Sequence, residues 1–468
     1  MNPPPYPDRL GTGILHFGPG AFHRAHQADY IDQLLQQDPR WGIAAVSLRT
    51  ADTVEAMKSQ GGLYTLAILD EQTSFRTIGA HTRFLGPSDH ASVRSQLVDP
   101  AVRIVTSTVT EKGYCLNGDG SLDFNHPDIV HDLASPATPR SLIGWLALGL
   151  ADRRKANIAP FTSICCDNMA NNGKKLANAV SSFASRIDSE LARWIDEEPR
   201  FPDTMVDSIT PATDETLRRL VREKTGFDDQ VPVAREAFAQ WVIEDILPAD
   251  SPDLASIGVT LTNEVNAWER TKLRILNGAH SALAYIGLLL GHQTVADAMR
   301  DPRLSSFVER LVLDDIIPSL PPSSINLRSY ADETFARFRN RAINHRLSQI
   351  AWDGSQKLPY RLLDTMTEAR AAGRTLRRLV LPIAAWILFL DRQVSAGAKI
   401  VDPLADTLAE RVCSGAPVER ILTLRQVFPQ ELGDDPRFSC ALKEAFADMR
   451  AIGVAAAIDG VLLPGTND

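Results

Sequence analysis

Three polar residues in one apolar segment have the types and spacing for proton-transfer chemistry: Lys272, Asn277 and His280. They lie in WERTKLRILNGAHSALAYIG (Trp268 to Gly287), where apolar residues dominate and proline is absent, so we expect a buried helix. Offsets of five and eight from Lys272 keep all three within about two turns, inside a ~150° arc. A buried lysine can lose its proton near neutral pH, because desolvation disfavours the ammonium form. An amide can steady an alkoxide and an imidazole can hold a hydroxyl; the alternative is a helix with scattered polar residues.

Glu269 lies three residues before Lys272 on the same expected helix face. It could relay a proton to the lysine or shift its pKa, and a surface ion pair at i,i+3 is the equal alternative. Zinc could also polarise a reacting oxygen, but no Cys/His set with ligand spacing occurs in the sequence. We therefore expect metal-independent chemistry.

A glycine pair follows the first strand-like run, GILHF at 13–17, and opens a helical pattern over 21–37. Glycines at such a turn let the backbone approach a pyrophosphate, which then sits on the helix N-terminus. The third glycine of the common dinucleotide fingerprint is missing, and Phe22-His23 occupy that region. A plain tight turn is the alternative to a nucleotide loop. The expected cofactor-binding residues are Phe17, Gly18, Gly20, Ala21 and Phe22.

Two arginines near this loop have open roles. Arg24 could meet a phosphate, or it and its neighbours could only cap and pack the helix. Arg49 directly follows the second strand-like run, where a carboxylate usually selects NAD and an arginine accepts the 2′-phosphate of NADP. The nearest acid, Asp52, comes three residues later, so these residues leave NADP open.

The order and spacing of apolar runs along the chain predict two domains. Strand-like runs alternate with helical patterns up to Val265, which implies parallel βαβ units and a doubly wound sheet. SIGVTLTNEV (256–265) is expected to be the last strand of this α/β domain, 1–265. Helical patterns then dominate a second, mainly α-helical domain, 266–468. They cover 268–291, 304–315, 331–350, 360–372, 375–393, 402–414 and 438–457.

Composition excludes several function classes. The 468 residues are 44% hydrophobic and 23% charged, as in ordinary soluble proteins, and the net charge of −9 argues against a nucleic-acid surface. The longest apolar run, Leu379 to Leu390, is too short to span a bilayer and contains a proline. The five cysteines include no Cys-x-x-Cys motif, so a disulfide framework is not expected. The first residues, MNPPPYPDRL, lack the basic and then apolar stretch of a secretory signal, so we expect a cytoplasmic protein. We expect a small-molecule substrate, no membrane partner, and a monomer or weak oligomer.

The segment around Lys272 resembles the Lys-x4-Asn-x2-His signature of the polyol-specific long-chain dehydrogenases, or mannitol dehydrogenase family. Further blocks resemble the family in order along nearly the whole chain. They are HFGPGAFHRAHQ (16–27), TVTEKGYC (108–115), CDNMANNG (166–173), FPDTMVDSITP (201–211), QWVIED (240–245) and DGSQKLPYR (353–361).

The resemblance implies a Rossmann-like NAD-binding domain, a helical domain and hydride transfer at a CH–OH group. It also implies that Lys272 is the catalytic acid/base and that Asn277 and, by the CDN motif, Asn168 hold the substrate oxygen. A turn after the strand FTSICC is the alternative role for Asn168. For the cofactor it implies NAD.

Two blocks resemble the fructuronate-reducing branch more than the mannitol-oxidising one. Lys112 stands where mannitol-type members have glycine, and Gln349 stands where they have arginine. A carboxylate substrate such as fructuronate needs cationic or amide partners. The candidates, each of which could instead be a solvated surface charge, are Lys357, Arg361, His345 and Lys112. The alternatives are a polyol dehydrogenase acting on mannitol or arabinitol and, more remotely, a nucleotide-binding sensor without catalysis.

Overall fold

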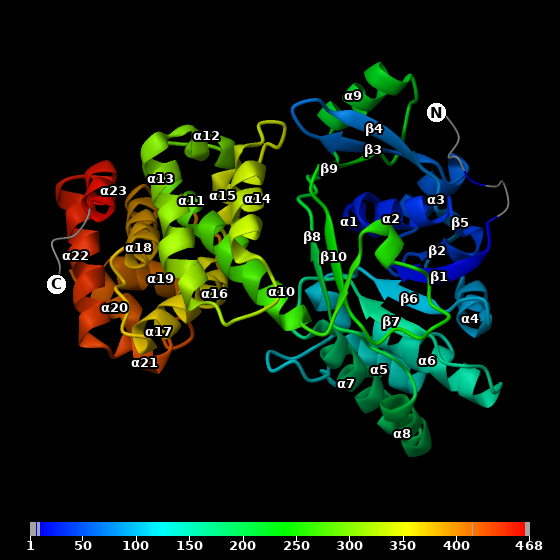
Figure 1. Ribbon diagram of the computed structural model, residues 1–468. Helices are drawn as coiled ribbons and strands as arrows, with labels where there is room; N and C mark the ends of the chain where they lie inside the picture. Colours follow the sequence, from blue (N-terminus) through cyan, green and yellow to red (C-terminus); the bar gives the residue numbers. More distant parts are fainter. Residues whose placement is uncertain (1–5, 7–9, 414, 464–468) are drawn as a thin grey trace. The chain divides into compact units, whose positions relative to one another are not determined.

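The computed structural model describes Tyr6, residues 10–413 and residues 415–463 (Figure 1). The prediction that Met1 to Leu10 is not a secretory signal falls mostly outside the described residues. The last five residues of the second predicted domain, 464–468, also lie outside them. The chain forms two compact units, Met1–Asn266 and Ala267–Asp468. No helix among the described residues is long and apolar enough to cross a membrane.

The first unit is built on a five-stranded parallel sheet in the order β5-β2-β1-β6-β7. The chain runs outward from β1 to one edge and then crosses to the other side of β1, so the order reverses between β1 and β6. This is the doubly wound, Rossmann-type topology, in which ligands bind at the carboxyl ends of the strands near the reversal. The strands are β1 (Thr12–Phe17), β2 (Gly42–Val46), β5 (His81–Leu85), β6 (Ile104–Ser107) and β7 (Thr162–Cys165).

Alternate residues of these strands enter two separate hydrophobic cores, one on each face of the sheet. Leu15 and Val105 pack under helices α4, α6, α7 and α8, whereas Ile14 and Ile104 pack with α2 and Trp241. Burial on both faces explains why the strands are apolar runs without polar alternation. The helices of the unit are α1 (Ala21–Ala25), α2 (Gln27–Leu34), η1 (Pro39–Trp41), α3 (Asp52–Ser59), α4 (His90–Val98), η2 (Glu111–Tyr114), α5 (Pro127–Ala134), α6 (Leu142–Lys155), α7 (Asn172–Ser185), α8 (Ser189–Glu197), α9 (Glu215–Thr225) and η3 (Ala255–Ile257).

Two small sheets complete the first unit (Figure 1). In one, β10 pairs antiparallel with β8 and parallel with β11; in the other, β3 pairs antiparallel with β4 and parallel with β9. The expected last strand is therefore only three residues long and belongs to a separate sheet. The strands are β3 (Tyr64–Leu69), β4 (Ser74–Ile78), β8 (Thr204–Asp207), β9 (Val233–Glu236), β10 (Gln240–Glu244) and β11 (Thr260–Thr262).

The second unit is helical among its described residues, with α18 at the centre of its core, packed against α11, α19, α20 and α22. Its helices are α10 (Val265–Thr271, which begins in the first unit), α11 (Gly278–Leu289), α12 (Val295–Arg300), α13 (Pro302–Arg310), η6 (Ile317–Ser319), α14 (Leu327–Arg339), α15 (Leu347–Ile350), α16 (Gly354–Leu358), α17 (Asp364–Ala371), α18 (Val380–Ser395), α19 (Ala405–Val412), α20 (Pro417–Leu422), α21 (Gln430–Gly433), α22 (Pro436–Ala451) and α23 (Val454–Leu462).

Three π-helical segments interrupt these helices: η4 (Lys272–Asn277), η5 (Leu311–Ile316) and η7 (Pro359–Leu363). The first packs against both of the others. Segments of π-helix are rare and occur frequently at functional sites. The buried helix expected over 268–287 is therefore present but is not a regular α-helix.

Three predicted helices are broken in the structure. The stretch 438–457 divides at Ile452 and Gly453, where Gly453 has a φ of +90°, so α22 ends at Ala451 and α23 begins at Val454. The stretch 21–37 divides at His26, whose φ of −121° and ψ of −85° end α1 and begin α2. The prediction of one helix over 331–350 is wrong in the middle of that range, because α14 ends at Arg339 and α15 begins only at Leu347. The main-chain N–H of Val295 donates to the His345 carbonyl at 3.0 Å, so contacts outside the segment replace helical hydrogen bonds there.

Candidate functional sites in the two units

The glycine loop of the first unit lies where the strand order reverses. Gly18 follows β1 with a φ of +89°, and a Cβ added to it would lie 2.2 Å from the Thr108 carbonyl oxygen after β6. Only glycine fits both this backbone conformation and this close approach. Gly20, exposed before α1, donates its N–H to the Gly18 carbonyl at 2.7 Å. The loop thus leaves open backbone beside Ala21 and Phe22, as a pyrophosphate requires.

Buried histidines pack together next to this glycine loop. His16 and His23 stack with ring centroids 3.4 Å apart, and His23 Nε2 lies 3.0 Å from His81 Nε2. Burial lowers the pKa of His16 and of His81 to about 3, so these rings are neutral in the folded protein. His23 takes the place of the third fingerprint glycine as a packing residue, a role that its sequence position alone did not reveal.

Arg24 has the packing role rather than the phosphate role. Its side chain is buried and donates to two main-chain carbonyls, Pro19 at 3.2 Å and Val231. Those bonds tie α1 to the chain before β9. They use donors that a phosphate would need.

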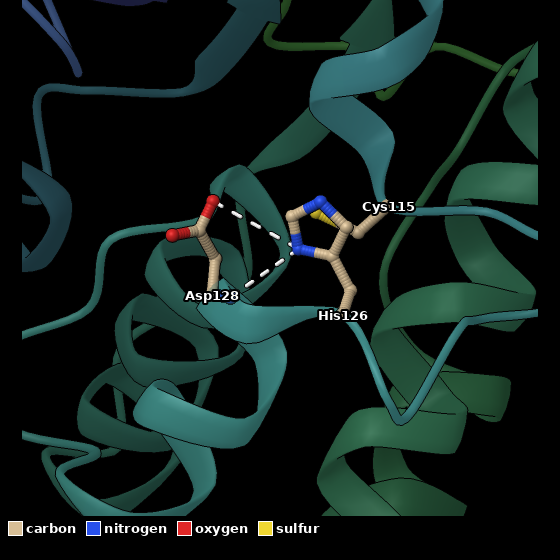
Figure 2. A group of neighbouring side chains, drawn as sticks. All are labelled: Cys115, His126 and Asp128. Atoms are coloured by element: carbon tan, nitrogen blue, oxygen red, sulfur yellow. Dashed lines mark hydrogen bonds and ion pairs between the residues drawn. The ribbon is translucent and has the colours of Figure 1, made fainter.

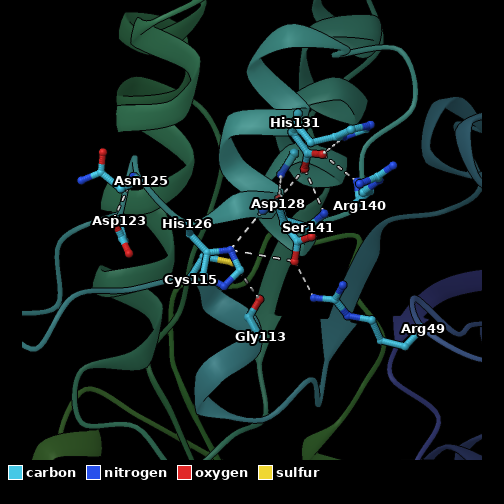
Figure 3. Close-up of polar contacts among 12 residues, drawn as sticks. Arg49, Gly113, Cys115, Asp123, Asn125, His126, Asp128, His131, Arg140 and Ser141 are labelled. Atoms are coloured by element: carbon cyan, nitrogen blue, oxygen red, sulfur yellow. Dashed lines mark hydrogen bonds and ion pairs between the residues drawn. The ribbon is translucent and has the colours of Figure 1, made fainter.

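A cavity of about 600 Å³ opens at the carboxyl ends of β2 and β5. Val46, Arg49, Gly86 and Trp145 are among its lining residues. This is the side of a doubly wound sheet where the adenosine half of a dinucleotide binds. Arg49 is exposed and its guanidinium contacts the Asp128 carboxylate of α5 at 2.5 Å (Figure 3). Sequence reasoning singled out Arg49 but missed Asp128, which lies 79 residues away.

Asp128 also belongs to the one group of side chains, among the described residues, whose spacing could suit a metal ion. The possible ligand atoms of Cys115, His126 and Asp128 lie within 4.8 Å of one another (Figure 2). Each residue has another role, however. Asp128 binds Arg49, and its main-chain N–H donates to His126 Nδ1 at 3.2 Å. Burial raises the pKa of the Cys115 thiol to about 12, whereas a metal needs the thiolate.

The CDNMANNG block after β7 is mostly architectural. Asp167 accepts the N–H of Val109 at 2.9 Å and the Tyr114 hydroxyl at 2.8 Å, which ties the loop after β6 to the loop after β7. Asn172 is buried and accepts the Thr204 N–H at 2.8 Å. Asn168 stands exposed between them at the carboxyl end of β7. The block therefore fixes a loop that carries Asn168, the asparagine of this block for which a substrate role is expected.

In the helical unit, Lys272 and Asn277 are the first and last residues of η4. Hydrogen bonds from i to i+5 in a π-helix place residues five apart about one turn from each other. Lys272 is buried, Asn277 is half-buried, and Glu269 is half-buried one turn earlier in α10. The wider turn changes the arc assumed for a regular helix and brings the lysine and the amide onto one side.

Gly278 brings this segment against η7. A Cβ on Gly278 would lie 2.8 Å from the Arg361 carbonyl oxygen, so the glycine after Asn277 permits close contact between the two π-helical segments. The same contact carries the Arg361 side chain to α11, where it donates to the Ser281 hydroxyl at 3.2 Å.

His280 and His345 form the neighbouring part of this cluster. Their ring centroids are 5.0 Å apart, and His280 also packs on Phe338. His280 Nε2 and His345 Nδ1 are buried without a hydrogen-bond partner among the described residues. Burial first, then the charges of nearby arginines, lowers the pKa of His345 to about 4. Burial first, then His345 and the same arginines, holds the pKa of His280 well below its ordinary value. Both rings are thus neutral, with a nitrogen left for a ligand hydroxyl.

Arg361 and Lys357 supply positive charge to the cluster. Arg361 has no carboxylate partner in the described part of the chain, and burial lowers its pKa to about 10. Lys357 lies 4.0 Å from Asp353, and burial together with Arg361 lowers its pKa. Of the predicted substrate residues, the structure therefore brings together Arg361, His345 and Lys357. Lys112 belongs to the other unit, where it is exposed in η2, and its part in substrate binding stays a prediction.

Comparisons with known proteins agree over both units. Residues 12–256 match the family model for the mannitol dehydrogenase Rossmann domain, and residues 264–450 match the mannitol dehydrogenase C-terminal domain. The D-mannonate oxidoreductase of Escherichia coli (strain K12) is 38% identical, over 94% of this chain and 94% of that protein. The mannitol 2-dehydrogenase of Cereibacter sphaeroides is 39% identical, over 84% of each. The structure of Pseudomonas fluorescens mannitol 2-dehydrogenase in complex with NAD and D-mannitol has 34% identity and a TM-score of 0.83, covering 98% of this chain and 96% of that one.

Proposed function

The chain belongs to the mannitol dehydrogenase family of oxidoreductases, and from this premise we propose that it interconverts D-fructuronate and D-mannonate with NAD. Two findings support the cofactor: the glycine loop at the reversal of the sheet and the NAD complex of the P. fluorescens relative. Relatives that act on mannitol match at similar identity, so the choice of substrate depends on the chemistry of this chain's own residues.

The observation that carries the substrate proposal is the Arg361 guanidinium, which has no carboxylate partner among the described residues. A partly buried guanidinium without a carboxylate partner is costly unless a ligand supplies the anion. Lys357 lies in the same electrostatic neighbourhood, since its pKa responds to Arg361. A sugar acid brings the carboxylate that such a cluster lacks, whereas a neutral polyol does not.

The remaining residues have roles that follow from their chemistry. Lys272 takes the proton of the substrate hydroxyl during oxidation and returns it to the carbonyl oxygen during reduction. Asn277 and Asn168 are proposed to donate amide N–H groups to that oxygen as negative charge develops on it. His280 and His345 are proposed to bind hydroxyls through their unpartnered nitrogens. Bound NAD supplies the hydride acceptor, and no metal is required in this scheme.

The test is a substrate panel on the purified chain, followed by nicotinamide absorbance with NAD(H) and with NADP(H). The panel contains fructuronate, mannonate and other sugar acids, with fructose, mannitol and arabinitol as neutral comparisons. We expect kcat/KM for fructuronate to exceed that for fructose. Equal or better turnover of fructose or mannitol would contradict the proposal and favour a polyol dehydrogenase. Absence of turnover with every substrate would favour the non-catalytic sensor.

A further inference from the structure

The cavity beside β2 lacks the acidic residue that such sites usually take from the strand itself. In dinucleotide-binding sheets, a carboxylate after the second strand hydrogen-bonds the adenosine ribose. Here the chain continues Ser47-Leu48-Arg49 after β2. Of the described residues that line the cavity, only Asp128 has a carboxylate, and it comes from α5 on another part of the chain.

The position of Asp128 is well defined. Its side chain is 13% exposed, against 63% for Arg49, so the arginine reaches inward to meet it. The Arg49 guanidinium first of all, then its charge and those of His126 and Arg140, keeps the pKa of Asp128 below its ordinary value. Arg140 also lines the cavity. Among the described residues that line the cavity, Asp128 thus supplies the only carboxylate, and it binds Arg49 (Figure 3).

We propose that Asp128 determines a preference of this site for NAD over NADP. Its carboxylate holds Arg49, the side chain best placed to pair with a 2′-phosphate, and it adds negative charge to the wall where that phosphate would approach. The inference rests on the proposed function only in taking a nicotinamide dinucleotide as the cofactor; it does not depend on the sugar substrate.

Removal of this ion pair should leave the fold intact. A pair with one exposed partner contributes little to stability. The first turn of α5 is capped by His126 Nδ1, which accepts the Asp128 N–H, and not by the Asp128 carboxylate. Asp128→Asn keeps the shape of the side chain and removes its charge. Asp123→Asn is the matched control, because Asp123 precedes the same helix but does not line the cavity.

The experiment measures dissociation constants of NADH and NADPH by fluorescence titration of the full chain, with kcat/KM for both cofactors alongside. Wild type should bind NADH more tightly. Asp128→Asn should shift the ratio of the two constants toward NADPH on the order of tenfold, the effect of about one charge pair. Asp123→Asn should leave the ratio unchanged. Arg49→Gln combined with Asp128→Asn should lose the gain in NADPH binding.

The other outcomes overturn the inference in distinguishable ways. A wild-type preference for NADPH, or an unchanged ratio in Asp128→Asn, contradicts the role of Asp128. Retention of the gain in the double variant contradicts the part assigned to Arg49. Failure of the wild-type chain to bind either nucleotide overturns the cofactor assignment, and this inference with it. Tight NADH binding without turnover of sugar acids would refute only the proposed substrate.

Discussion

Lys272 is the residue on which the proposed proton transfer depends. Lys272→Ala should lower kcat by about 10²–10⁴-fold, because general acid–base groups typically contribute that much. Binding of NADH should survive, since the glycine loop belongs to the other unit. Lys399→Ala, at an exposed lysine of the helical unit, is the control and should match wild type. A kcat near the wild-type value in Lys272→Ala would refute the assignment.

The two asparagines are expected to act mainly in the transition state. Asn277→Ala and Asn168→Ala should each lower kcat more than they raise KM, since an amide that binds a developing alkoxide can contribute about 2.7–4 kcal/mol. Steady-state kinetics with the preferred substrate measures both constants. Asn125→Ala, in an exposed loop, is the control. An effect confined to KM would make the asparagines ground-state binders.

Lys357 and Arg361 are the residues expected to recognise the carboxylate. Lys357→Met and Arg361→Met should each reduce kcat/KM for fructuronate more than for fructose, because a desolvated carboxylate left without a partner costs on the order of 1–3 kcal/mol or more. The ratio of the two kcat/KM values is the measurement, with Lys399→Met as the control. If Lys357→Met harms both substrates equally, Lys357 binds a hydroxyl common to both, and Arg361 becomes the principal carboxylate partner.

At the scale of elements, the histidines below the glycine loop make the first unit sensitive to acid. The folded-state pKa of His16 and of His81 is about 3, below the value of about 6.5 in an unfolded chain. Their neutral, buried state is therefore fully favourable above pH 6.5. As the pH falls from 6.5 toward 3, the unfolded chain binds protons that the folded chain does not. Each histidine then lowers the free energy of unfolding by up to about 1.4 kcal/mol per pH unit.

Urea denaturation at pH 7.5 and pH 5.5 tests this expectation. Other groups also titrate in this window; burial raises the pKa of Asp32 to about 6, which acts in the opposite direction. The informative quantity is therefore the difference between wild type and His81→Gln. The variant should lose less stability than wild type between the two pH values. An equal loss would mean that His81 is not responsible for the acid sensitivity.

At the scale of the whole molecule, the proposed chemistry requires no metal. Treatment with EDTA should leave activity unchanged, because in the proposed chemistry Lys272 rather than a metal-bound water exchanges the proton with the substrate. Cys115, His126 and Asp128 are the group to examine if this fails. Loss of activity that zinc restores, but does not restore in His126→Ala, would assign a metal to that group. His292→Ala, at a histidine of the other unit, is the control.

Features that depend on short-range patterns could be predicted from the sequence. Apolar runs between helical patterns predicted the parallel sheet, because strands buried on both faces must be apolar throughout. The glycines after β1 marked a backbone position that side chains cannot occupy, and Lys272, Asn277 and His280 share one helical segment. The ordered blocks predicted the family, which the comparisons confirm.

The contacts between distant residues and the regularity of each helix could not be predicted in this way, because they depend on how the folded chain packs. Arg361 reaches Ser281 across 80 residues, and Arg49 reaches Asp128 across 79. Such pairs depend on how the chain returns after many residues, which no local periodicity encodes. The π-helical turn at Lys272 is likewise not encoded in a local periodicity; the glycine that follows it, Gly278, lies against the Arg361 backbone. Side chains that look like solvated surface charges in the sequence become partners for ligands, or for each other, only when packing removes water from around them.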